Sequence, residues 1–325
     1  MVAKQQGFTR MLTLEVTRVT ERAAVAASFQ VGRGDEKDAD QAAVDAMRRE
    51  LNELDIDGTI VIGEGERDEA PMLYIGEKVG SGNGPKVDIA LDPLEGTTLT
   101  AKAQANALAV IAVAESGTLL NAPDVYMDKI AVGPGYPRGT VDLDNTPEQN
   151  IKAVAKVKGV GVDGVNVCIM DRPRHAALIK AVRDAGAAVY LISDGDVAGV
   201  IATTDPTTNI DLYLGIGGAP EGVLAAAALR CIGGHMQGRL ITDSDDQKAR
   251  ATKMGIKDFN KKFELEEMVS GDVIFCATGV TDGSLLEGVH RLPGGAYTTH
   301  SVVMRSATGT VRWIKARHAS LKKFK

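Results

Sequence analysis

Hydrophobic residues near the start of the chain recur at the spacing of an α-helix. This pattern predicts an amphipathic helix over residues 11–29, and Gly32, Arg33 and Gly34 predict a break after it. A second helix is expected over 39–50, after acidic residues that suit the positive end of a helix dipole. Both helices precede the strands on which we expect the chemistry to lie.

The first half of the chain is organised around an apolar run that begins at Val87. The run predicts a buried strand, which we expect to end at Asp92 because Pro93 has no backbone N–H to donate. Glu95, Gly96 and Thr97 follow within about one turn of chain. The carboxyl end of such a strand is where open α/β sheets bind ligands, and carboxylates and hydroxyls suit hard divalent cations. The plainer alternative is a strand end followed by a solvated turn.

Further strands are predicted on both sides of this central one. The short β-branched run 58–62 leads into Gly63, Glu64, Gly65 and Glu66, where glycines let the backbone turn sharply around a carboxylate. An acidic surface turn is the alternative at this point. Three more strands of this half are expected over 71–79, 107–114 and 126–132.

The second half alternates strongly between strands and helices. Strands are predicted over 165–170, 187–193 and 210–216, and helices over 174–185, 196–203 and 220–231. This order favours a parallel sheet covered by helices. The closing strands are expected over 272–278 and 298–314. We therefore expect an α/β protein with an α+β domain over 1–145 and an α/β domain over 146–325.

One glycine motif is excluded as a nucleotide site by its context. Residues 159–164 read G-x-G-x-x-G, but the pattern places them after a helix and before a strand. A dinucleotide fingerprint leaves a strand and opens a helix. There is also no phosphate-binding P-loop sequence.

Composition narrows the classes of protein that remain. The 325 residues are 44% hydrophobic and 25% charged with a net charge of −6, so no basic surface for nucleic acid is expected. No apolar stretch has the roughly 20 residues of a membrane span, and no secretory signal is recognisable. The cysteines at 168, 231 and 276 lie in apolar runs and are expected to be buried free thiols. We expect a cytoplasmic protein without membrane or nucleic-acid partners.

Several acidic and glycine-rich motifs together resemble one phosphatase family. They are Asp40, then Gly63–Glu66, then Asp92–Thr97, then Gly217–Gly222, which reads Gly-Gly-Ala-Pro-Glu-Gly. This series resembles the lithium-sensitive, metal-dependent sugar phosphatases, and within them the class II fructose-1,6-bisphosphatases. The string Gln-Ala-Asn-Ala-Leu-Ala-Val at 104–110 is also typical of that class, and Glu95 stands where the inositol phosphatase branch usually has Asp. The resemblance extends over about residues 11–315.

The resemblance implies roles for particular residues. Asp40 and Glu64 would bind a first Mn²⁺ or Mg²⁺, and Asp92, Glu95 and Glu221 a second. Thr97 would orient or activate the attacking water, with an acidic neighbour such as Asp40 or Glu64 taking its proton. Substrate contacts would come from Glu95, Gly96, Thr97, Tyr126, Arg172, Pro173, Arg174, Asp194, Gly195, Asp196 and Gly218. Arg172 replaces a lysine found in relatives, and Glu36 stands where the family often has a lysine.

The implied reaction is hydrolysis of fructose 1,6-bisphosphate to fructose 6-phosphate and phosphate, in gluconeogenesis or a reductive pentose cycle. The implied fold is the layered sugar-phosphatase arrangement, and a homo-oligomer, either dimer or tetramer, is expected. Two alternatives stay open on the sequence alone. One is a sedoheptulose 1,7-bisphosphatase or an enzyme with both activities, because the two sugars present a similar 1-phosphate. The other is a catalytically silent phosphosugar-binding regulator on the same fold.

Overall fold

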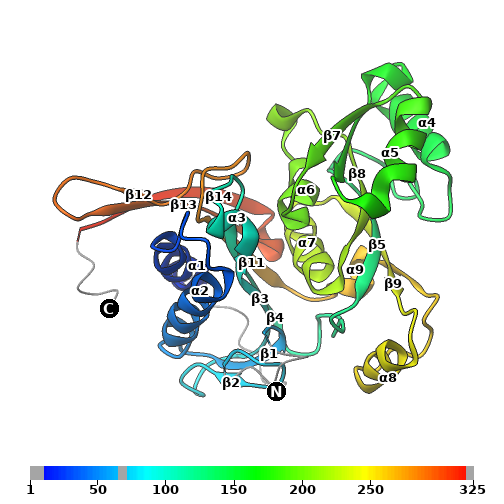
Figure 1. The fold of residues 1–325 in the computed structure, drawn as a ribbon. Helices are drawn as coiled ribbons and strands as arrows, with labels where there is room; N and C mark the ends of the chain where they lie inside the picture. The colour runs from blue at the N-terminus through cyan, green and yellow to red at the C-terminus, as the bar shows by residue number, and fades with distance from the viewer. Residues whose placement is uncertain (1–10, 65–71, 320–325) are drawn as a thin grey trace. The chain divides into compact units, whose positions relative to one another are not determined.

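The computed structural model describes residues 11–64 and 72–319 (Figure 1). The chain forms two compact units, and the first is discontinuous in sequence. Unit 1 comprises the described residues up to Leu119 and again from Gly271, and unit 2 comprises Leu120–Ser270. This division differs from the expected boundary between residues 145 and 146. The physical reason is that the strand Val273–Gly279 near the end of the chain pairs with the strand Leu108–Glu115, in the sheet formed by the first part of the chain.

Unit 1 combines one mixed sheet with helices. Its helices are α1 (Leu12–Ser28), α2 (Glu36–Leu51) and the short α3 (Thr97–Ala101). Its strands are β1 (Asp57–Ile62), β2 (Lys78–Val79), β3 (Lys86–Glu95), β4 (Leu108–Glu115), β11 (Val273–Gly279), β12 (His290–Arg291), β13 (Tyr297–Arg305) and β14 (Thr310–His318). In the described part of unit 1 these eight strands form one sheet in the order β12-β13-β11-β4-β3-β1-β2, with β14 paired to β13.

The core of unit 1 lies between this sheet and helices α1 and α2. Strand β11 is buried along its whole length and pairs antiparallel with β4. The helical spacing predicted for α1 places Val16, Val19 and Ala23 inside, each with 0% exposed surface. Figure 1 shows α1 and α2 side by side, and both contact strands of the sheet. The predicted amphipathic helices are therefore confirmed, with α2 beginning three residues earlier than expected, at Glu36.

The prediction that the central strand ends at Asp92 is wrong. Strand β3 continues through Pro93 to Glu95. Asp92 pairs with Val110 and Glu95 with Leu108, so the register shifts between them. This irregularity lets the sheet accommodate a residue that cannot donate a backbone hydrogen bond. Both carboxylates of the motif consequently belong to the strand itself.

The strand expected over 71–79 is much shorter in the structure. Only β2 (Lys78–Val79) pairs as a strand, antiparallel to β1. Tyr74 forms an isolated parallel bridge with Glu64. Residues 65–71, which include the second half of the Gly-Glu-Gly-Glu motif, lie outside the described residues.

Unit 2 is an α/β arrangement built on a second sheet. Its strands are β5 (Tyr126–Val132), β6 (Asn166–Met170), β7 (Ala188–Ile192), β8 (Leu212–Gly218), β9 (His235–Ile241) and β10 (Lys262–Glu264), in the order β10-β9-β5-β8-β6-β7. Its α-helices are α4 (Pro147–Lys158), α5 (Ala176–Asp184), α6 (Asp196–Ala202), α7 (Ala219–Ile232), α8 (Asp245–Lys253) and α9 (Leu265–Met268). The predicted parallel pairing holds for β6 with β7 and with β8, whereas β5, β9 and β10 add antiparallel pairs.

Helices cover both faces of the second sheet. Helices α4 and α5 contribute Ile151, Val154, Ile179 and Val182 to a core with alternate residues of β5, β6 and β8. The opposite face meets α6 closely enough that a Cβ at Gly199 would crowd Tyr213 and Cys168. The strands are apolar on both faces for this reason, as the continuous runs in the sequence indicated.

Two smaller expectations are confirmed within the described residues. The G-x-G-x-x-G stretch follows α4, whose C-cap is Gly159, and leads through a 3-10 turn into β6. Cys168, Cys231 and Cys276 are free and buried. Burial raises the pKa of the Cys276 thiol to about 12.

No helix in the described part of the chain is long and apolar enough to cross a bilayer.

Candidate active site

The predicted site residues fall into two sets, one on each unit. Asp40, Glu64, Asp92, Glu95, Gly96 and Thr97 belong to unit 1, whereas Tyr126, Arg172, Pro173, Arg174, Asp194, Gly195, Asp196, Gly218 and Glu221 belong to unit 2. In unit 1, Glu64 and Thr97 follow strand ends, whereas Asp92 and Glu95 lie in β3 itself and Asp40 lies in α2. In unit 2, residues 172–174 and 194–196 follow strand ends, as the sequence indicated.

The turn from β3 into α3 places two predicted residues on either side of one glycine. Gly96 has a φ of 94°, a left-handed conformation that suits glycine, and it is the N-cap residue of α3. Glu95 before it is buried with 6% exposed surface, and Thr97 after it is the first residue of the helix. The Asp92 carboxylate accepts a hydrogen bond of 3.0 Å from the Leu94 backbone N–H, which fixes its orientation.

Helix α2 and the segment before it are tied to this turn by hydrogen bonds to α3. The Thr98 hydroxyl donates to the Glu36 carboxylate over 2.9 Å. Gly32 N–H donates to the Thr100 carbonyl over 2.9 Å. Glu36 thus links the start of α2 to α3.

Asp40 lies in α2 and carries a perturbed carboxyl group. Burial raises the pKa of Asp40 above its usual range. Among the described residues no hydrogen bond or ion pair reaches its side chain. A half-buried carboxylate without such a partner is the kind of group that a cation stabilises.

Glu64 follows β1 at a place where the backbone is tightly packed. Its N–H donates to the Leu73 carbonyl over 3.0 Å. A Cβ on the preceding Gly63 would overlap that same carbonyl, so only glycine fits there. The Gly-Glu pair is therefore a packed feature of the fold, although its continuation lies outside the described residues.

The unit 2 residues gather at one edge of the sheet. Strands β6, β7 and β8 run parallel, so their carboxyl ends lie at the same edge. Residues 172–174 follow β6, residues 194–196 follow β7, and Gly218 ends β8. This is the edge at which parallel sheets bind ligands.

The arginines after β6 are held by specific contacts. Arg174 donates from Nε and Nη2 to the Ile216 carbonyl over 3.1 and 2.8 Å. Its guanidinium also lies 4.7 Å from the centre of the Tyr126 ring. Arg172 pairs with Asp194 over 3.2 Å. The structure therefore brings four predicted substrate residues into two contacting pairs.

His175 has a structural role that the sequence did not reveal. Its ring is buried, with Nδ1 at 2.7 Å from the Met170 carbonyl, and Nε2 accepts from the Ile216 N–H over 2.8 Å. These partners require the neutral tautomer protonated on Nδ1. The ring thus fastens the Arg172–Arg174 turn to β8.

Lys129 is a second residue that sequence reasoning missed. It lies on β5 with 0% exposed surface and pairs with Asp196. It also donates to the Gly218 carbonyl over 2.7 Å. A signal was available, because a lysine in phase with Met127 and Ala131 on an apolar strand is unusual.

Glu221 lies in the first turn of α7, directly after Pro220. Its Oε2 atom is buried and accepts no hydrogen bond. Burial raises the pKa of Glu221, the nearby Asp196 charge adds to the rise, and Lys129 opposes it. A carboxylate in this state fits the oxygen-ligand chemistry of a divalent cation.

The structure supports only some of the predicted carboxylates as metal ligands. Burial raises the pKa of the Asp40 and Glu221 carboxyl groups, and the Glu221 Oε2 atom accepts no hydrogen bond, as expected of ligands. Within residues 11–64 and 72–319, however, no three His, Cys, Asp or Glu side chains come close enough to hold a metal ion. The five-carboxylate ligand set therefore stays a prediction.

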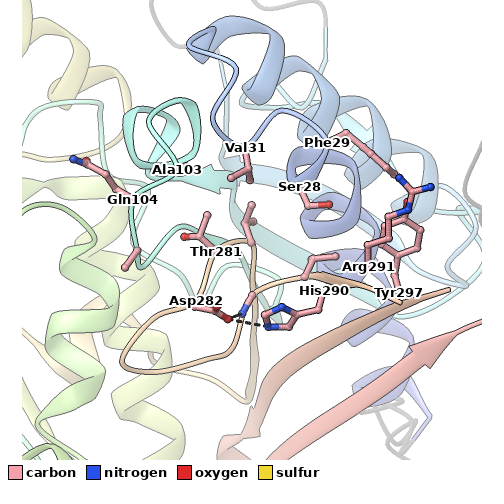
Figure 2. A pocket seen from close by; sticks show the side chains of 14 residues that line it. Ser28, Phe29, Val31, Ala103, Gln104, Thr281, Asp282, His290, Arg291 and Tyr297 are labelled. Atoms are coloured by element: carbon pink, nitrogen blue, oxygen red, sulfur yellow. Dashed lines mark hydrogen bonds and ion pairs between the residues drawn. The ribbon is translucent and has the colours of Figure 1, made fainter. Parts of the chain in front are cut away.

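A pocket of unit 1 is lined by a different set of residues. Figure 2 shows it between the end of α1, the segment after α3 and the segment between β11 and β13. Its volume is about 470 Å³, and its wall includes an ion pair of 3.0 Å between His290 and Asp282. None of the predicted site residues lines it.

Comparison with known proteins decides the family. A sequence profile described as "Bacterial fructose-1,6-bisphosphatase, glpX-encoded" matches residues 10–318. The chain belongs to this family. It is 49% identical over 323 residues to the class 2 fructose-1,6-bisphosphatase 1 of Escherichia coli (strain K12), covering 95% of each chain. The class 2 fructose-1,6-bisphosphatase of Shigella flexneri matches to the same extent.

Family membership links the predicted site residues of both units to one kind of enzyme. The class II fructose-1,6-bisphosphatase family consists of phosphatases that depend on a divalent metal. The profile covers both units, so it includes the acidic residues of unit 1 and the basic residues of unit 2. The mixed α/β content with two mixed sheets agrees with the predicted fold class.

Proposed function

We propose that this chain hydrolyses D-fructose 1,6-bisphosphate to fructose 6-phosphate and phosphate. The observation that carries the proposal is the match to the class II fructose-1,6-bisphosphatase family over residues 10–318. The arrangement of unit 2 supports it, because arginines and backbone groups at the carboxyl ends of β6, β7 and β8 suit a phosphorylated ligand.

The carboxylates of the motifs are proposed to hold the metals. Asp40 and Glu64 would bind one cation, and Asp92, Glu95 and Glu221 another, either Mn²⁺ or Mg²⁺. Such cations polarise a phosphoryl group and stabilise a leaving oxygen when bound. The protein's own contribution is to keep these carboxylates oriented, as the Asp92–Leu94 hydrogen bond does for Asp92.

Thr97 is proposed to position the water that attacks the 1-phosphate. Its place as the first residue of α3, beside the buried Glu95, puts a hydroxyl next to a carboxylate in sequence and at a fixed turn. The hydroxyl would hold the water, and Asp40 or Glu64 would take the proton that the water loses. Gly96 would contribute its backbone at the same turn.

The residues of unit 2 are proposed to select the substrate. Tyr126, Pro173, Gly195 and Gly218 would shape the site, and Arg172, Arg174, Asp194 and Asp196 would bind the sugar and its second phosphate. We also propose that the enzyme acts in the cytoplasm as a homo-oligomer in gluconeogenesis.

A phosphate-release assay over several substrates tests the proposed function. Fructose 1,6-bisphosphate, sedoheptulose 1,7-bisphosphate and inositol monophosphate would be compared with Mg²⁺ and with Mn²⁺. We expect the highest kcat/KM on fructose 1,6-bisphosphate. Higher activity on inositol monophosphate would overturn the proposal, preference for the sedoheptulose ester would shift it to that substrate, and no activity would favour a regulator.

Replacing Arg174 by alanine is expected to raise KM for fructose 1,6-bisphosphate by about tenfold to a hundredfold. Two of its N–H groups are used on the Ile216 carbonyl, which leaves others for a phosphate remote from the chemistry. A charge-assisted hydrogen bond is worth about 1.5–3 kcal/mol. Steady-state kinetics measures the change.

The control for this variant is Arg183→Ala, which removes an exposed arginine from the last turn of α5. It deletes the same charge from the same unit, away from the strand ends. An equal rise of KM in both variants would show that overall charge, rather than a contact of Arg174, attracts the substrate.

Replacing Glu221 by glutamine is expected to weaken metal activation strongly while the protein stays folded. Glutamine keeps the shape but removes a charge that burial disfavours, so the melting temperature of the metal-free protein should not fall. The concentration of Mn²⁺ needed for half-maximal phosphate release measures the effect. The matched control is Glu148→Gln, at an exposed position just after Pro147 in α4. Normal turnover of Glu221→Gln at low metal would make Glu221 a simple helix-start residue.

A further inference from the structure

Lys129 is a charged residue in the middle of an apolar sheet. It has 0% exposed surface, and its neighbours in register are Gly215 on β8 and Gly238 on β9. Lysine is almost never fully buried unless it is paired. Its side chain runs close to a glycine that follows β8, since a Cβ on Gly222 would lie 3.5 Å from Lys129 Cδ.

The Lys129 ammonium group joins two of the turns that carry predicted substrate residues. It forms an ion pair with Asp196, the first residue of α6, which has 4% exposed surface. It also donates a hydrogen bond of 2.7 Å to the carbonyl of Gly218, the N-cap residue of α7. A single cation on β5 therefore connects the turn after β7 with the turn after β8.

The backbone beside the ammonium group is packed so closely that no side chain larger than glycine fits at two positions. A Cβ on Gly217 would overlap the Asp196 carboxylate and lie 3.0 Å from Lys129 Nζ. A Cβ on Gly218 would overlap the Glu221 carboxylate. The two adjacent glycines thus allow two carboxylates to lie directly against the backbone of this turn, with the ammonium group of Lys129 beside them.

A stabilising role alone does not account for this arrangement. Removing two charges from water is costly, and well-packed apolar residues are often as stable as a buried ion pair or more so. An ion pair does, however, fix the orientation of a carboxylate that would otherwise have several rotamers. What the buried lysine supplies, and an apolar residue could not, is this fixed geometry.

We propose that Lys129 is a positioning residue of the active site, which holds the Asp196 carboxylate and the Gly218 carbonyl in one fixed arrangement. The proposal rests on the proposed function, since it assigns those two groups to substrate binding. Lys129 itself is fully buried and does not touch substrate. Its effect on catalysis passes through Asp196 and the Gly217–Gly218 backbone.

The test uses the full chain with Lys129→Met, Lys129→Gln and a control. Methionine fills the space without a charge, and glutamine restores a donor. The control is Lys158→Met, because Lys158 has the same kinds of partner in the same unit, the Asp211 carboxylate at 2.8 Å and the Gly164 carbonyl at 2.9 Å. These three variants and the wild type are compared by hydrogen exchange without ligand and by steady-state kinetics.

We expect Lys129→Met to increase backbone exchange at 194–199 and 217–222 and to raise KM for fructose 1,6-bisphosphate by about tenfold or more, the scale of one charge-assisted hydrogen bond. Lys129→Gln should have backbone exchange and a KM between those of Lys129→Met and the wild type. Lys158→Met should change neither the exchange nor the KM. Unchanged KM in a folded Lys129→Met protein would overturn the positioning role, whether or not exchange increases. So would failure of both Lys129 variants to fold while Lys158→Met folds, because Lys129 would then serve folding.

The same experiment gives a different result if the proposed function itself is wrong. The wild type would then release no phosphate from any sugar bisphosphate. The exchange comparison would still decide whether Lys129 holds the two turns, since it needs no substrate. Equal exchange in the wild type and Lys129→Met would overturn the proposal in that case as well.

Discussion

Removal of divalent metal is expected to abolish phosphate release by this protein, and Mn²⁺ or Mg²⁺ should restore it. The reason is that the predicted ligands are carboxylates, and for two of them, Asp40 and Glu221, burial disfavours the charged form. Burial raises the pKa of both Asp40 and Glu221, so a bound cation would favour the charged forms that burial disfavours. Residual activity after chelation and dialysis, followed by titration with each metal, measures the dependence.

The melting temperature gives a second readout of the same prediction. A ligand that binds only the folded protein stabilises it in proportion to the logarithm of its concentration. Mn²⁺ should therefore raise the melting temperature of the chelated wild type, and it should raise that of Glu221→Gln less. The control is a chelator already saturated with metal. Full turnover in a metal-free sample would end the metal-assisted mechanism.

The Thr97→Ala variant is expected to lose about 10²–10⁴ in kcat, whereas Thr97→Ser should keep measurable turnover. This range is the usual contribution of a positioned group in proton transfer. Serine retains the hydroxyl that would hold the attacking water, and alanine does not. Phosphate release at saturating substrate and metal measures both variants.

The structure already weakens the alternative role of Thr97 as a helix cap. As the cap of a helix over residues 98–104, Thr97 would cost about 1 kcal/mol of stability when replaced by alanine. In the structure α3 begins at Thr97 itself, the N-cap residue is Gly96, and no side chain caps the helix. We therefore expect Thr97→Ala to melt close to the wild type.

Thr98→Ala is the matched control for this position. It removes a hydroxyl one residue along, whose partner is the Glu36 carboxylate at 2.9 Å and which has no proposed part in the chemistry. Its turnover should remain near that of the wild type. An active Thr97→Ala enzyme, or an equal loss in both variants, would contradict the catalytic role of Thr97.

Local patterns in the sequence predicted most elements of the fold. Periodicity identified α1, α2 and the strand–helix alternation of unit 2, because each element buries one continuous apolar face or run. The polar residues after β6, β7 and β8 were also predicted, since strand ends are marked by abrupt changes in polarity. Their convergence at one edge follows from parallel pairing.

Features that depend on distant pairing were not predictable in this way. Strand β11 pairs with β4, although Val273 and Ala114 are far apart in sequence, and this pairing moves the last strands into unit 1. The extension of β3 past Pro93 depends on a register shift against β4. Local periodicity carries no information about which strands become neighbours.

In the candidate site, too, local motifs were predictable from the sequence and contacts between distant residues were not. The motifs named the residues at strand ends, but not the buried groups that fix them. Lys129 and His175 act through partners 67 and 41 residues away, respectively. Such partners are apparent only once the sheet is assembled.

The order of pairing in unit 1 has a consequence for the newly synthesised chain. Strand β4 emerges from the ribosome before all of unit 2, and its antiparallel neighbour β11 emerges after it. A translating ribosome therefore presents a complete unit 2 sequence while the sheet of unit 1 still lacks β11, β13 and β14. During that interval the apolar edge of β4 has no partner strand. Unpaired strand edges in partly folded chains are prone to aggregate, and chaperones protect such species.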